Sequence, residues 1–495
     1  MDFLYLCAEN LIDMDKKFIG RNAEYKVLTN YFTSKGSEFI AVYGRRRVGK
    51  TFLIRKAAND KFAFFLTGAH EVPKNEQLIN FAIAIQKHFQ TKRLEIPKNW
   101  ILAFYQLSQH LETLPKGNKI IFIDELPWLS TAKSGFLAAL ENFWNSWASL
   151  RDDIKLVVCG SATSWMIDNL IHSRGGLHNR ITHQIVLEPF TLNECEAYFR
   201  AYGFSYSRKQ IAECYMVMGG IPYYMSLMDK SKSVAQNIDQ LFFASNASLK
   251  DEFSELYHAL FKKANSHIQV VTALAIKGKG LTRQEIVKAA NVTDNGALST
   301  VLEELEKCGF IRTYEPFGNI QKPTEKRQKS DTLFQLIDFY TLFYFDFIIQ
   351  NKYHDEHFWT TSINSPLHNA WSGIAFERLC LAHLSQIKKA LGISGVQTIA
   401  CSWRSSSAKK NSQIDLLIDR KDETINVCEM KYCQGKYEID QDYEKTLNDR
   451  LATFIEETGT KKSILLTFVT IEGVKQNIHS GGVQCEVVLN ELFEE

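Results

Sequence analysis

The segment Gly44–Thr51 limits the fold of this chain more than any other part of it. It reads GRRRVGKT and matches the pattern G-x-x-x-x-G-K-[ST] in full, between the apolar run EFIAVY and the helical pattern TFLIRKAAND. Glycines let such a loop curve so that backbone N–H groups and the next helix N-terminus point at phosphate oxygens. The sequence therefore predicts a phosphate-binding loop made of Gly44, Arg45, Arg46, Arg47, Val48, Gly49, Lys50 and Thr51.

The last two residues of this loop have distinct expected roles. Lys50 would reach the β- and γ-phosphates of ATP, and the hydroxyl of Thr51 would ligate Mg²⁺. ATP and Mg²⁺ are therefore the expected ligands of the chain. The alternative is a degenerate loop that binds the nucleotide and no longer hydrolyses it.

An acidic pair follows a second apolar run. Asp124 and Glu125 come directly after the strand pattern IIFI, where Asp124 would hold Mg²⁺ and Glu125 would orient the attacking water. The next strand ends at Ser161, a small polar residue expected to sense the γ-phosphate. Surface carboxylates at a strand end are the alternative. Taken together, the three elements indicate an ATPase of the class with an inserted strand and a catalytic glutamate.

The rest of the first 190 residues supports an α/β fold with a parallel sheet. Continuous apolar strands alternate with helical patterns there, which is typical of a sheet covered on both faces. We predict a P-loop ATPase domain over 1–190, a helical lid over 191–265, a winged-helix domain over 266–330, a helical linker over 331–364, and a second α/β domain over 365–495.

Composition narrows the list of partners. The chain has 58 Lys and Arg against 56 Asp and Glu, a formal net charge of +2, so any contact with DNA or RNA needs a local patch. The ten cysteines form no CxxC pair, and buried free thiols in a reducing cytoplasm are expected. No apolar run reaches the length of a membrane span. The sequence predicts a cytoplasmic protein without a membrane partner, and a homo-oligomer is compatible with it.

The winged-helix pattern has few features of a sequence-specific DNA-binding domain. Thr293, Asn295 and Ser299 could reach phosphates or base edges, and the basic residues Lys322, Lys326, Arg327 and Lys329 could anchor backbone phosphates. The predicted recognition helix, however, contains Glu303, Glu304 and Glu306. Packing against the lid is therefore an equal alternative to DNA binding.

A second group of carboxylates lies near the C-terminus. Glu429 and Lys431 share one face of a predicted strand, and Asp415 on the neighbouring strand can come alongside them. Two carboxylates that hold Mg²⁺ beside a lysine are the arrangement that a metal-dependent phosphodiesterase needs. Glu377, on a preceding predicted helix, is a further candidate for this site. In the alternative, Lys431 only neutralises Glu429 in a closed ion pair.

The quoted motifs resemble those of the archaeal-type ATPases, which belong to the signal-transducing P-loop NTPases related to the AAA superfamily. The resemblance covers roughly 16–350 and rests on FIGRNAEYKVL, YGRRRVGKT, FIDELPWL, CGSAT, GGLHNRITHQIVLEPF and MGGIPYYM. It implies that Phe18, Gly20, Arg21 and Glu24 lie beside the nucleotide base and that the turn with Gly220 and Pro222 approaches adenine. It also implies a γ-phosphate contact for Arg180, which could equally be a surface residue in a salt bridge.

The C-terminal part is similar to PD-(D/E)xK nuclease-like domains. That resemblance implies Glu377, Asp415, Glu429 and Lys431 as site residues. The leading hypothesis is an ATPase whose nucleotide state is coupled to a nuclease-like domain that interacts with nucleic acid. The alternatives are a non-catalytic ATP-dependent switch or scaffold and a plain transcription regulator.

Overall fold

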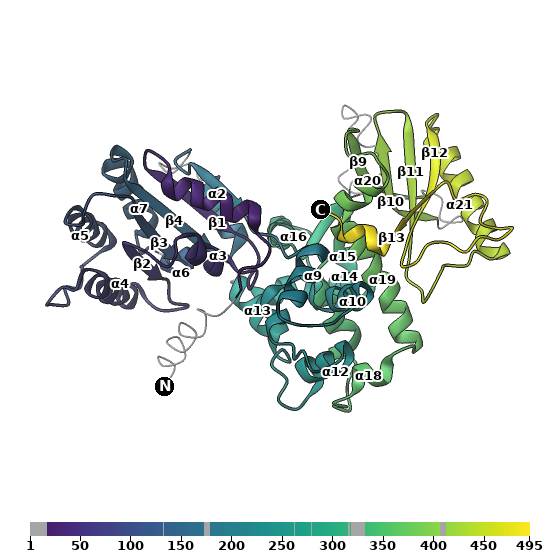
Figure 1. The fold of residues 1–495 in the computed structure, drawn as a ribbon, viewed down its shortest axis with the longest axis horizontal. Coiled ribbons are helices and arrows are strands. Elements are labelled where there is room, and N and C mark those ends of the chain that lie inside the picture. The colour runs from purple at the N-terminus through teal and green to yellow at the C-terminus, as the bar shows by residue number, and fades with distance from the viewer. Residues whose placement is uncertain are drawn as a thin grey trace. The chain divides into compact units, whose positions relative to one another are not determined.

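The chain divides into two compact units. The computed structural model describes residues 17–131, 133–172, 179–261, 263–278, 280–314, 317, 332–405 and 412–495. The units are Met1–Glu188 and Pro189–Glu495, and each is described by itself below (Figure 1). The further division of the second unit stays a prediction.

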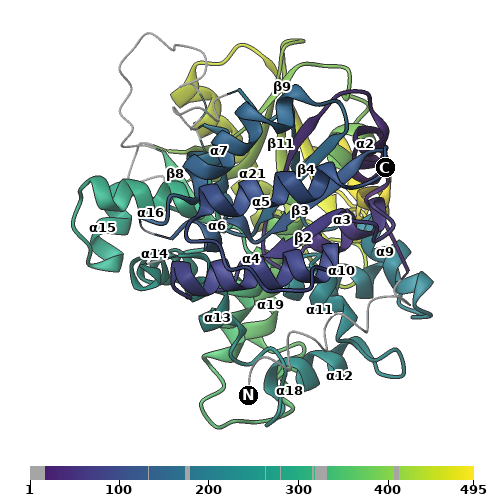
Figure 2. The same ribbon diagram turned by 90° about the vertical axis from the view of Figure 1, so that its left-hand side faces the viewer.

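The first unit is built on a five-stranded parallel sheet in the order β2-β3-β4-β1-β5. Strand β4 lies between β1 and β3, which confirms the predicted inserted strand. Figure 2 shows the same unit from the side on which α4 and α5 lie nearest the viewer. Its elements are α2 (Asn22–Thr33), β1 (Glu38–Tyr43), α3 (Lys50–Ala57), β2 (Phe64–Thr67), α4 (Lys74–Phe89), α5 (Trp100–Glu112), β3 (Lys119–Asp124), α6 (Leu126–Leu129), α7 (Phe136–Ser146), η2 (Ala148–Leu150), β4 (Ile154–Gly160), α8 (Thr163–Met166), η3 (Ile167–Ile171) and β5 (His183–Val186).

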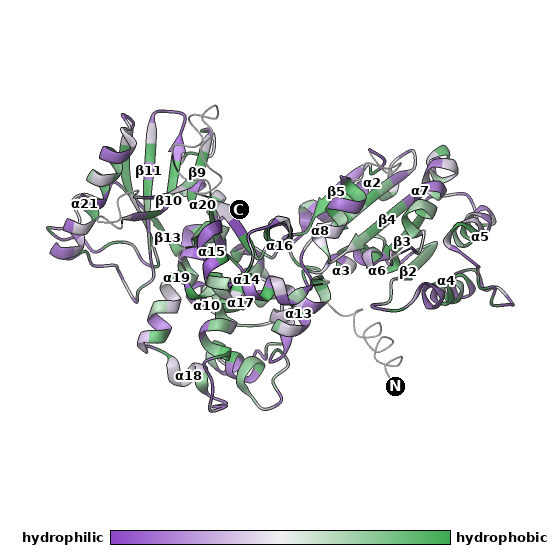
Figure 3. Ribbon diagram, turned by 180° about the vertical axis from the view of Figure 1, so that it is seen from behind, coloured by the Kyte–Doolittle hydropathy of each residue, from purple (hydrophilic) through white to green (hydrophobic). Residues whose placement is uncertain are grey.

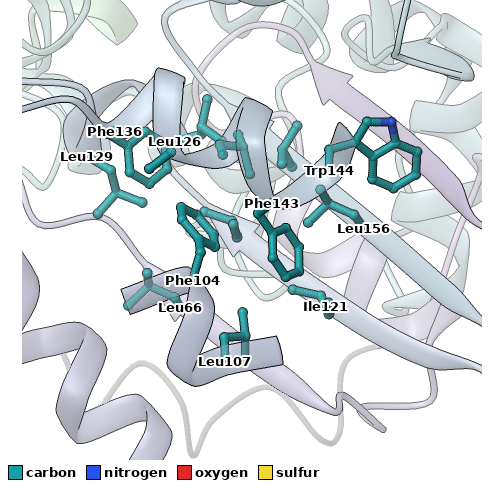
Figure 4. Packing of buried hydrophobic residues seen from close by; sticks show 14 of the residues in the cluster. Leu66, Phe104, Leu107, Ile121, Leu126, Leu129, Phe136, Phe143, Trp144 and Leu156 are labelled. Carbon is teal, nitrogen blue, oxygen red and sulfur yellow. The ribbon is translucent and has the colours of Figure 1, made fainter. Parts of the chain in front are cut away.

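The sheet is apolar on both faces because helices cover both. Side chains alternate along a strand, so Phe39 and Ala41 of β1 share one face and Ile40 and Val42 take the other. On the first face, strand residues pack with α4, α5 and α7 in one cluster of buried side chains. Figure 4 shows Phe104 of α5 close to Phe136 and Phe143 of α7 above the strands. This core holds the strand ends that carry the site.

Several helices of the second unit begin at side-chain caps that can be read in the sequence. The hydroxyls of Thr191 and Ser207 each accept a hydrogen bond from the backbone N–H three residues later. In return, the side chains of Glu194 and Gln210 accept from the backbone N–H of Thr191 and Ser207. The first half of this unit contains α9 (Leu192–Ala201), α10 (Arg208–Met218), α11 (Pro222–Ser226), α12 (Val234–Ile238), η4 (Asp239–Phe243), α13 (Glu252–Leu260), α14 (Ala264–Ile276), β6 (Leu281–Thr282), α15 (Arg283–Ala290), α16 (Gly296–Lys307), β7 (Ile311–Tyr314), β8 (Leu333–Leu336), α17 (Phe339–Phe343) and η6 (Tyr344–Ile348).

Part of the segment predicted as a helical linker is a strand in the structure. The segment from 331 on was predicted as an aromatic helix of a linker, but Leu333–Leu336 forms strand β8. This strand pairs antiparallel with β6 and β7 in a three-stranded sheet, so the unit with α14, α15 and α16 extends past residue 330. A run as short as these four residues fits either a helix or a strand, and in the structure it pairs with both β6 and β7. The winged-helix assignment itself stays a prediction.

The C-terminal part contains a mixed five-stranded sheet in the order β13-β12-β11-β10-β9. Strand β9 was missed in the sequence; it pairs antiparallel with β10. Figure 3 shows apolar strands here beside helices whose ribbons alternate between polar and apolar residues. The elements are α18 (Phe358–Ser362), α19 (Pro366–Ala382), α20 (Leu384–Ala390), β9 (Thr398–Arg404), β10 (Gln413–Arg420), β11 (Thr424–Lys431), α21 (Gln441–Thr458), β12 (Ser463–Thr470), β13 (Cys485–Val488) and η7 (Leu489–Phe493).

Candidate nucleotide site

The loop between β1 and α3 has a backbone that favours glycine at two points. Gly44 has φ of 147°, and a Cβ there would lie 2.2 Å from the carbonyl oxygen of Leu187. Gly49 has φ of 94° and precedes the first residue of α3. Arg47 between them is also left-handed, with φ of 69°. The close approach of Leu187 therefore requires glycine at Gly44, and the left-handed backbone favours glycine at Gly49.

Lys50 is buried and turned back over this loop. Its Nζ donates hydrogen bonds to the carbonyl oxygens of Gly44 (3.0 Å) and Arg45 (2.9 Å) and to the Ser161 hydroxyl (3.1 Å). Burial lowers the pKa of the ammonium group, while the charges of Glu125 and Asp124 raise it. The side chain is therefore positioned among oxygen acceptors in a site that lacks full compensation for its charge.

Thr51 and Asp124 meet at the base of the site. The Thr51 hydroxyl donates to Oδ2 of Asp124 at 2.9 Å, and Oδ1 accepts from the Glu125 backbone N–H at 2.9 Å. Burial raises the pKa of Asp124, and the charge of Glu125 raises it further. A buried carboxylate next to a second one is a place where a cation would be stabilised.

Glu125 has an unusual backbone and a defined side-chain position. Its φ of 47° is left-handed, a conformation that costs energy in a non-glycine residue and is common at functional sites. One carboxylate oxygen accepts from the Ser161 hydroxyl at 2.7 Å, and the other from the Ser161 backbone N–H at 3.3 Å. Ser161 therefore bridges Lys50 and Glu125, two residues of opposite charge.

Three residues near the acidic pair were not singled out in the sequence. A Cβ on Gly68 would lie 2.6 Å from the carbonyl oxygen of Glu125, and one on Gly160 would lie 2.7 Å from Pro127. The thiol of Cys159 contacts Oδ1 of Asp124 at 2.6 Å, and burial raises its pKa well above the usual range. Their position at the ends of β2 and β4 was the available signal, since the carboxyl ends of parallel strands meet at one edge.

The segment before α2 lies against α3, the helix that follows the phosphate-binding loop. The ring of Phe18 is 5.0 Å from that of Tyr25 and 6.1 Å from that of Phe52, which follows Thr51. Gly20 is left-handed, with φ of 66°. Arg21 is buried, donates to the carbonyl oxygen of Glu188 and lies 3.7 Å from Glu24.

Three further residues are implied for this site, namely Arg180, Gly220 and Pro222. Arg180 is exposed in the turn before β5. Gly220 and Pro222 belong to the second unit, where Gly220 has φ of 64° and its carbonyl oxygen accepts from Phe190 N–H at 2.8 Å. Pro222 is the first residue of α11, a position that suits proline. Their roles toward the nucleotide stay predictions.

Glu429, in the C-terminal part of the chain, contacts positively charged side chains of the chain itself. Arg450 of α21 donates to one carboxylate oxygen. The Tyr443 hydroxyl donates to the other at 2.7 Å, and Lys431 Nζ lies 3.4 Å from that same oxygen. The pKa of Arg450 is lowered by burial but raised on balance by Glu429 and Asp415. These contacts favour the alternative of a closed ion pair.

Asp415 and Glu377 are surrounded by two further arginines. Gln413 donates to Asp415 at 2.8 Å, and Arg378 Nη1 lies 3.8 Å from Glu377. Burial lowers the pKa of Arg378 to about 10, while the charges of Glu377 and Asp415 raise it. Burial lowers the pKa of Arg312 of β7, and the charge of Arg378 lowers it further, while Asp415 and Glu377 raise it. Among the described residues, no group of three or more His, Cys, Asp or Glu side chains could hold a metal ion.

The structure describes three of the residues predicted to contact nucleic acid and does not describe the other four. Thr293, Asn295 and Ser299 are exposed, and Asn295 caps α16 by accepting from Leu298 N–H at 3.1 Å. Two acidic residues of α16 are used inside the unit, because Glu304 contacts His267 at 2.7 Å and Glu303 contacts Lys307 at 2.7 Å. Lys322, Lys326, Arg327 and Lys329 lie outside the described residues.

The first-unit residues fit a nucleoside triphosphate and Mg²⁺ on chemical grounds. The first backbone amides of α3 have no partner within their own helix and can donate to phosphate oxygens. Lys50 supplies a positive charge at the loop, and Thr51 and Asp124 supply the hard oxygen ligands that Mg²⁺ prefers.

Residues 18–228 match a family described as an ATPase domain predominantly from Archaea. Residues 18–228 are therefore similar to an archaeal-type ATPase domain, and the match supports ATP binding. It begins at Phe18 and extends past Pro222, so it includes the first part of the second unit. The C-terminal part lies outside the match, and the nuclease-like resemblance gains no support from it.

Single proteins similar to this chain were found as well. An uncharacterized protein of Methanocaldococcus jannaschii is 23% identical over 375 residues, which is 75% of this chain and 78% of that protein. Among solved structures, a Walker-type ATPase of Pyrococcus abyssi has a TM-score of 0.46 at 18% identity, covering 66% of this chain and 95% of that one. The ORC2 protein of Aeropyrum pernix has a TM-score of 0.38 at 15% identity, covering 69% and 98%. No helix among the described residues is long and apolar enough to cross a membrane.

Proposed function

We propose that the first unit hydrolyses ATP. The observation that supports this most strongly is the continuous chain of hydrogen bonds from Lys50 through Ser161 to Glu125, next to the Thr51–Asp124 pair. A buried lysine, a polar bridge and a carboxylate are thereby held at one edge of a parallel sheet. These are the parts that phosphoryl transfer to water requires.

Each residue has a definable task in this reaction. Lys50 would exchange its two loop carbonyl contacts for phosphate oxygens, which carry more negative charge. The carboxylate of Glu125 would accept a hydrogen bond from water and orient it toward the phosphorus atom. Mg²⁺, when bound, would neutralise charge on the β- and γ-phosphates. Ser161, which touches both Lys50 and Glu125, would change partners when the γ-phosphate is lost.

The test is ATP binding and phosphate release by Lys50→Ala. The variant loses the positive charge that faces the phosphates, and we expect nucleotide affinity to fall by at least about tenfold, the loss of one charge-assisted hydrogen bond. Lys61→Ala is the matched control, because Lys61 is exposed and lies outside the loop. Wild-type affinity and turnover in Lys50→Ala would contradict the proposal.

For the whole chain we propose that the nucleotide state controls the C-terminal half. The support is that the matched ATPase domain extends into the second unit as far as the turn with Gly220 and Pro222. DNA or RNA is the proposed partner class, through the exposed cap of α16 and the basic stretch that follows β7. Nucleotide can drive such control only if it binds two arrangements of the chain with different affinity.

The contacts of Glu429 favour the non-catalytic form of this function over cleavage. A metal ion would have to displace Arg450 and Lys431 from Glu429, and both contacts neutralise its charge. A cleavage assay with Mg²⁺ or Mn²⁺ on several DNA and RNA forms tests this. We expect no metal-dependent product; cleavage that disappears in Asp415→Ala would restore the nuclease reading.

A further inference from the structure

The second unit contains a pocket that no part of the proposed function uses. It has a volume of about 370 Å³, within the range of roughly 300–1,000 Å³ common for small-molecule sites. Its walls come from α10, α12, the segment from α18 into α19, and the turn that follows β11. Glu213, Trp359, Asn364, His368, Tyr432 and Cys433 are among the lining residues.

The charge of the pocket is negative. Among the described residues that line it, Glu213 and His368 are the groups that could be charged near neutral pH. Burial lowers the pKa of His368, which leaves its imidazole neutral. Glu213 therefore gives the pocket its one formal charge.

The Glu213 carboxylate is only partly satisfied by the protein. The Tyr432 hydroxyl donates to one of its oxygens at 3.2 Å. Burial raises the pKa of Glu213 in spite of that hydrogen bond and of the charge of Lys209. The raised pKa means that the ionised form lacks compensation, so a positive charge brought into the pocket would stabilise it.

The neighbouring groups suit an organic cation better than a metal ion. Amide groups of Asn364 and Gln434 lie in the wall and are joined by a hydrogen bond of 3.1 Å, and Trp359 and Tyr432 add aromatic surface. No group of three or more acidic, His or Cys side chains suited to a metal occurs in the described parts of the chain. One carboxylate with aromatic and amide neighbours is the chemistry that recognises an ammonium or guanidinium group.

We propose that this pocket binds a small organic cation with an ammonium or guanidinium head, with Glu213 as the anchoring carboxylate. Such a head can belong to a free small molecule or to a Lys or Arg side chain of a protein partner. The pocket joins α10, which leads into the Gly220 turn, to the residues directly after Lys431. A bound cation would therefore contact the helical region and the segment that directly follows β11.

Calorimetric titration of the full chain tests the proposal with four probes. Agmatine and butylamine present the free heads, acetyl-Gly-Arg-Gly-amide presents a side chain, and pentanamide is the neutral control. We expect saturable binding of at least one cation and none of pentanamide, with binding at least about tenfold weaker in Glu213→Gln. Glu255→Gln, at an exposed position of α13, should leave affinity unchanged. Binding of the peptide alone would indicate a partner side chain, and binding of the free amines alone a small molecule.

Cysteine modification gives a second measurement that needs no variant. Cys433 lines the pocket, whereas Cys485 of β13 does not, and both are partly exposed. The bound cation should slow alkylation of Cys433 by iodoacetamide and leave Cys485 unaffected. No saturable binding of any cation, equal affinity in Glu213→Gln, or equal protection of both thiols would overturn the proposal.

Discussion

Replacing Glu125 with Gln separates nucleotide binding from hydrolysis. The change keeps the length and shape of the side chain and removes its charge. In the structure both carboxylate oxygens contact Ser161, one at the hydroxyl and one at the backbone N–H. A glutamine can keep both contacts, because its oxygen accepts from the N–H and its nitrogen donates to the hydroxyl oxygen. The fold and the loop around Lys50 should therefore remain unchanged.

The expected loss is in the chemical step. Removing a positioned base costs about 10²–10⁴-fold in rate, which corresponds to about 3 to 5 kcal/mol of transition-state stabilisation. Nucleotide affinity should be retained, because the variant removes a negative charge near the phosphates and leaves Lys50 and Thr51 in place. Burial and the charge of Glu125 raise the pKa of Asp124. Without that charge, both Asp124 and the incoming phosphates would experience less repulsion.

Single-turnover phosphate release and a fluorescent-nucleotide titration measure the two effects separately. Glu76→Gln is the matched control, because Glu76 is exposed in the first turn of α4. Hydrolysis by Glu125→Gln within about threefold of the wild type would refute the assignment of Glu125 as the base. A loss of affinity as large as that of Lys50→Ala would show instead that Glu125 supports the loop.

Two other predictions follow from the geometry. Gly44→Ala would place a Cβ 2.2 Å from the Leu187 carbonyl oxygen, so we expect weakened ATP binding and a lower melting temperature, measured by titration and calorimetry; an unchanged variant would contradict the close approach. Neutral His383 accepts from Leu192 N–H at 3.0 Å, and burial lowers its pKa from 6.5 to about 4. Below pH 6.5 the unfolded chain takes up a proton that the folded chain refuses, so stability is lost as pH falls from about 6.5 to 4, by up to about 3 kcal/mol. Denaturant unfolding at several pH values measures this, and His383→Gln should have a flatter profile; identical profiles would contradict the assignment.

The sequence predicted those features of the first unit that depend on local order along the chain. The strand, loop and helix around Lys50 could be read from one motif, and Asp124 and Ser161 follow from their places at strand ends. Only the inserted strand was expected from the class to which these ends were assigned; the full strand order came from the structure. The contact of Cys159 with Asp124 was missed because a buried thiol in an apolar strand has no distinctive pattern.

The C-terminal part shows why side-chain partners are harder to predict than strands. Glu429 and Lys431 lie on one strand and share a face, as their spacing indicates. Arg450 and Tyr443 contact Glu429 from α21, and the rotation of that helix against the sheet is set by packing of residues such as Phe454. The spacing of charges in the sequence contains no information on that rotation. The same spacing therefore fits a metal site and a neutralised ion pair equally well.

The place where the chain leaves the first unit is fixed by the nucleotide loop itself. The backbone of Leu187 donates to Tyr43, its carbonyl oxygen lies against Gly44, and the next carbonyl, of Glu188, accepts from Arg21. Pro189 follows, and a proline fixes its own φ and restricts the residue before it to extended conformations. Few torsion angles can therefore absorb a displacement of the loop at this point. We therefore expect a displacement of the nucleotide loop to move Leu187 and Glu188 with it.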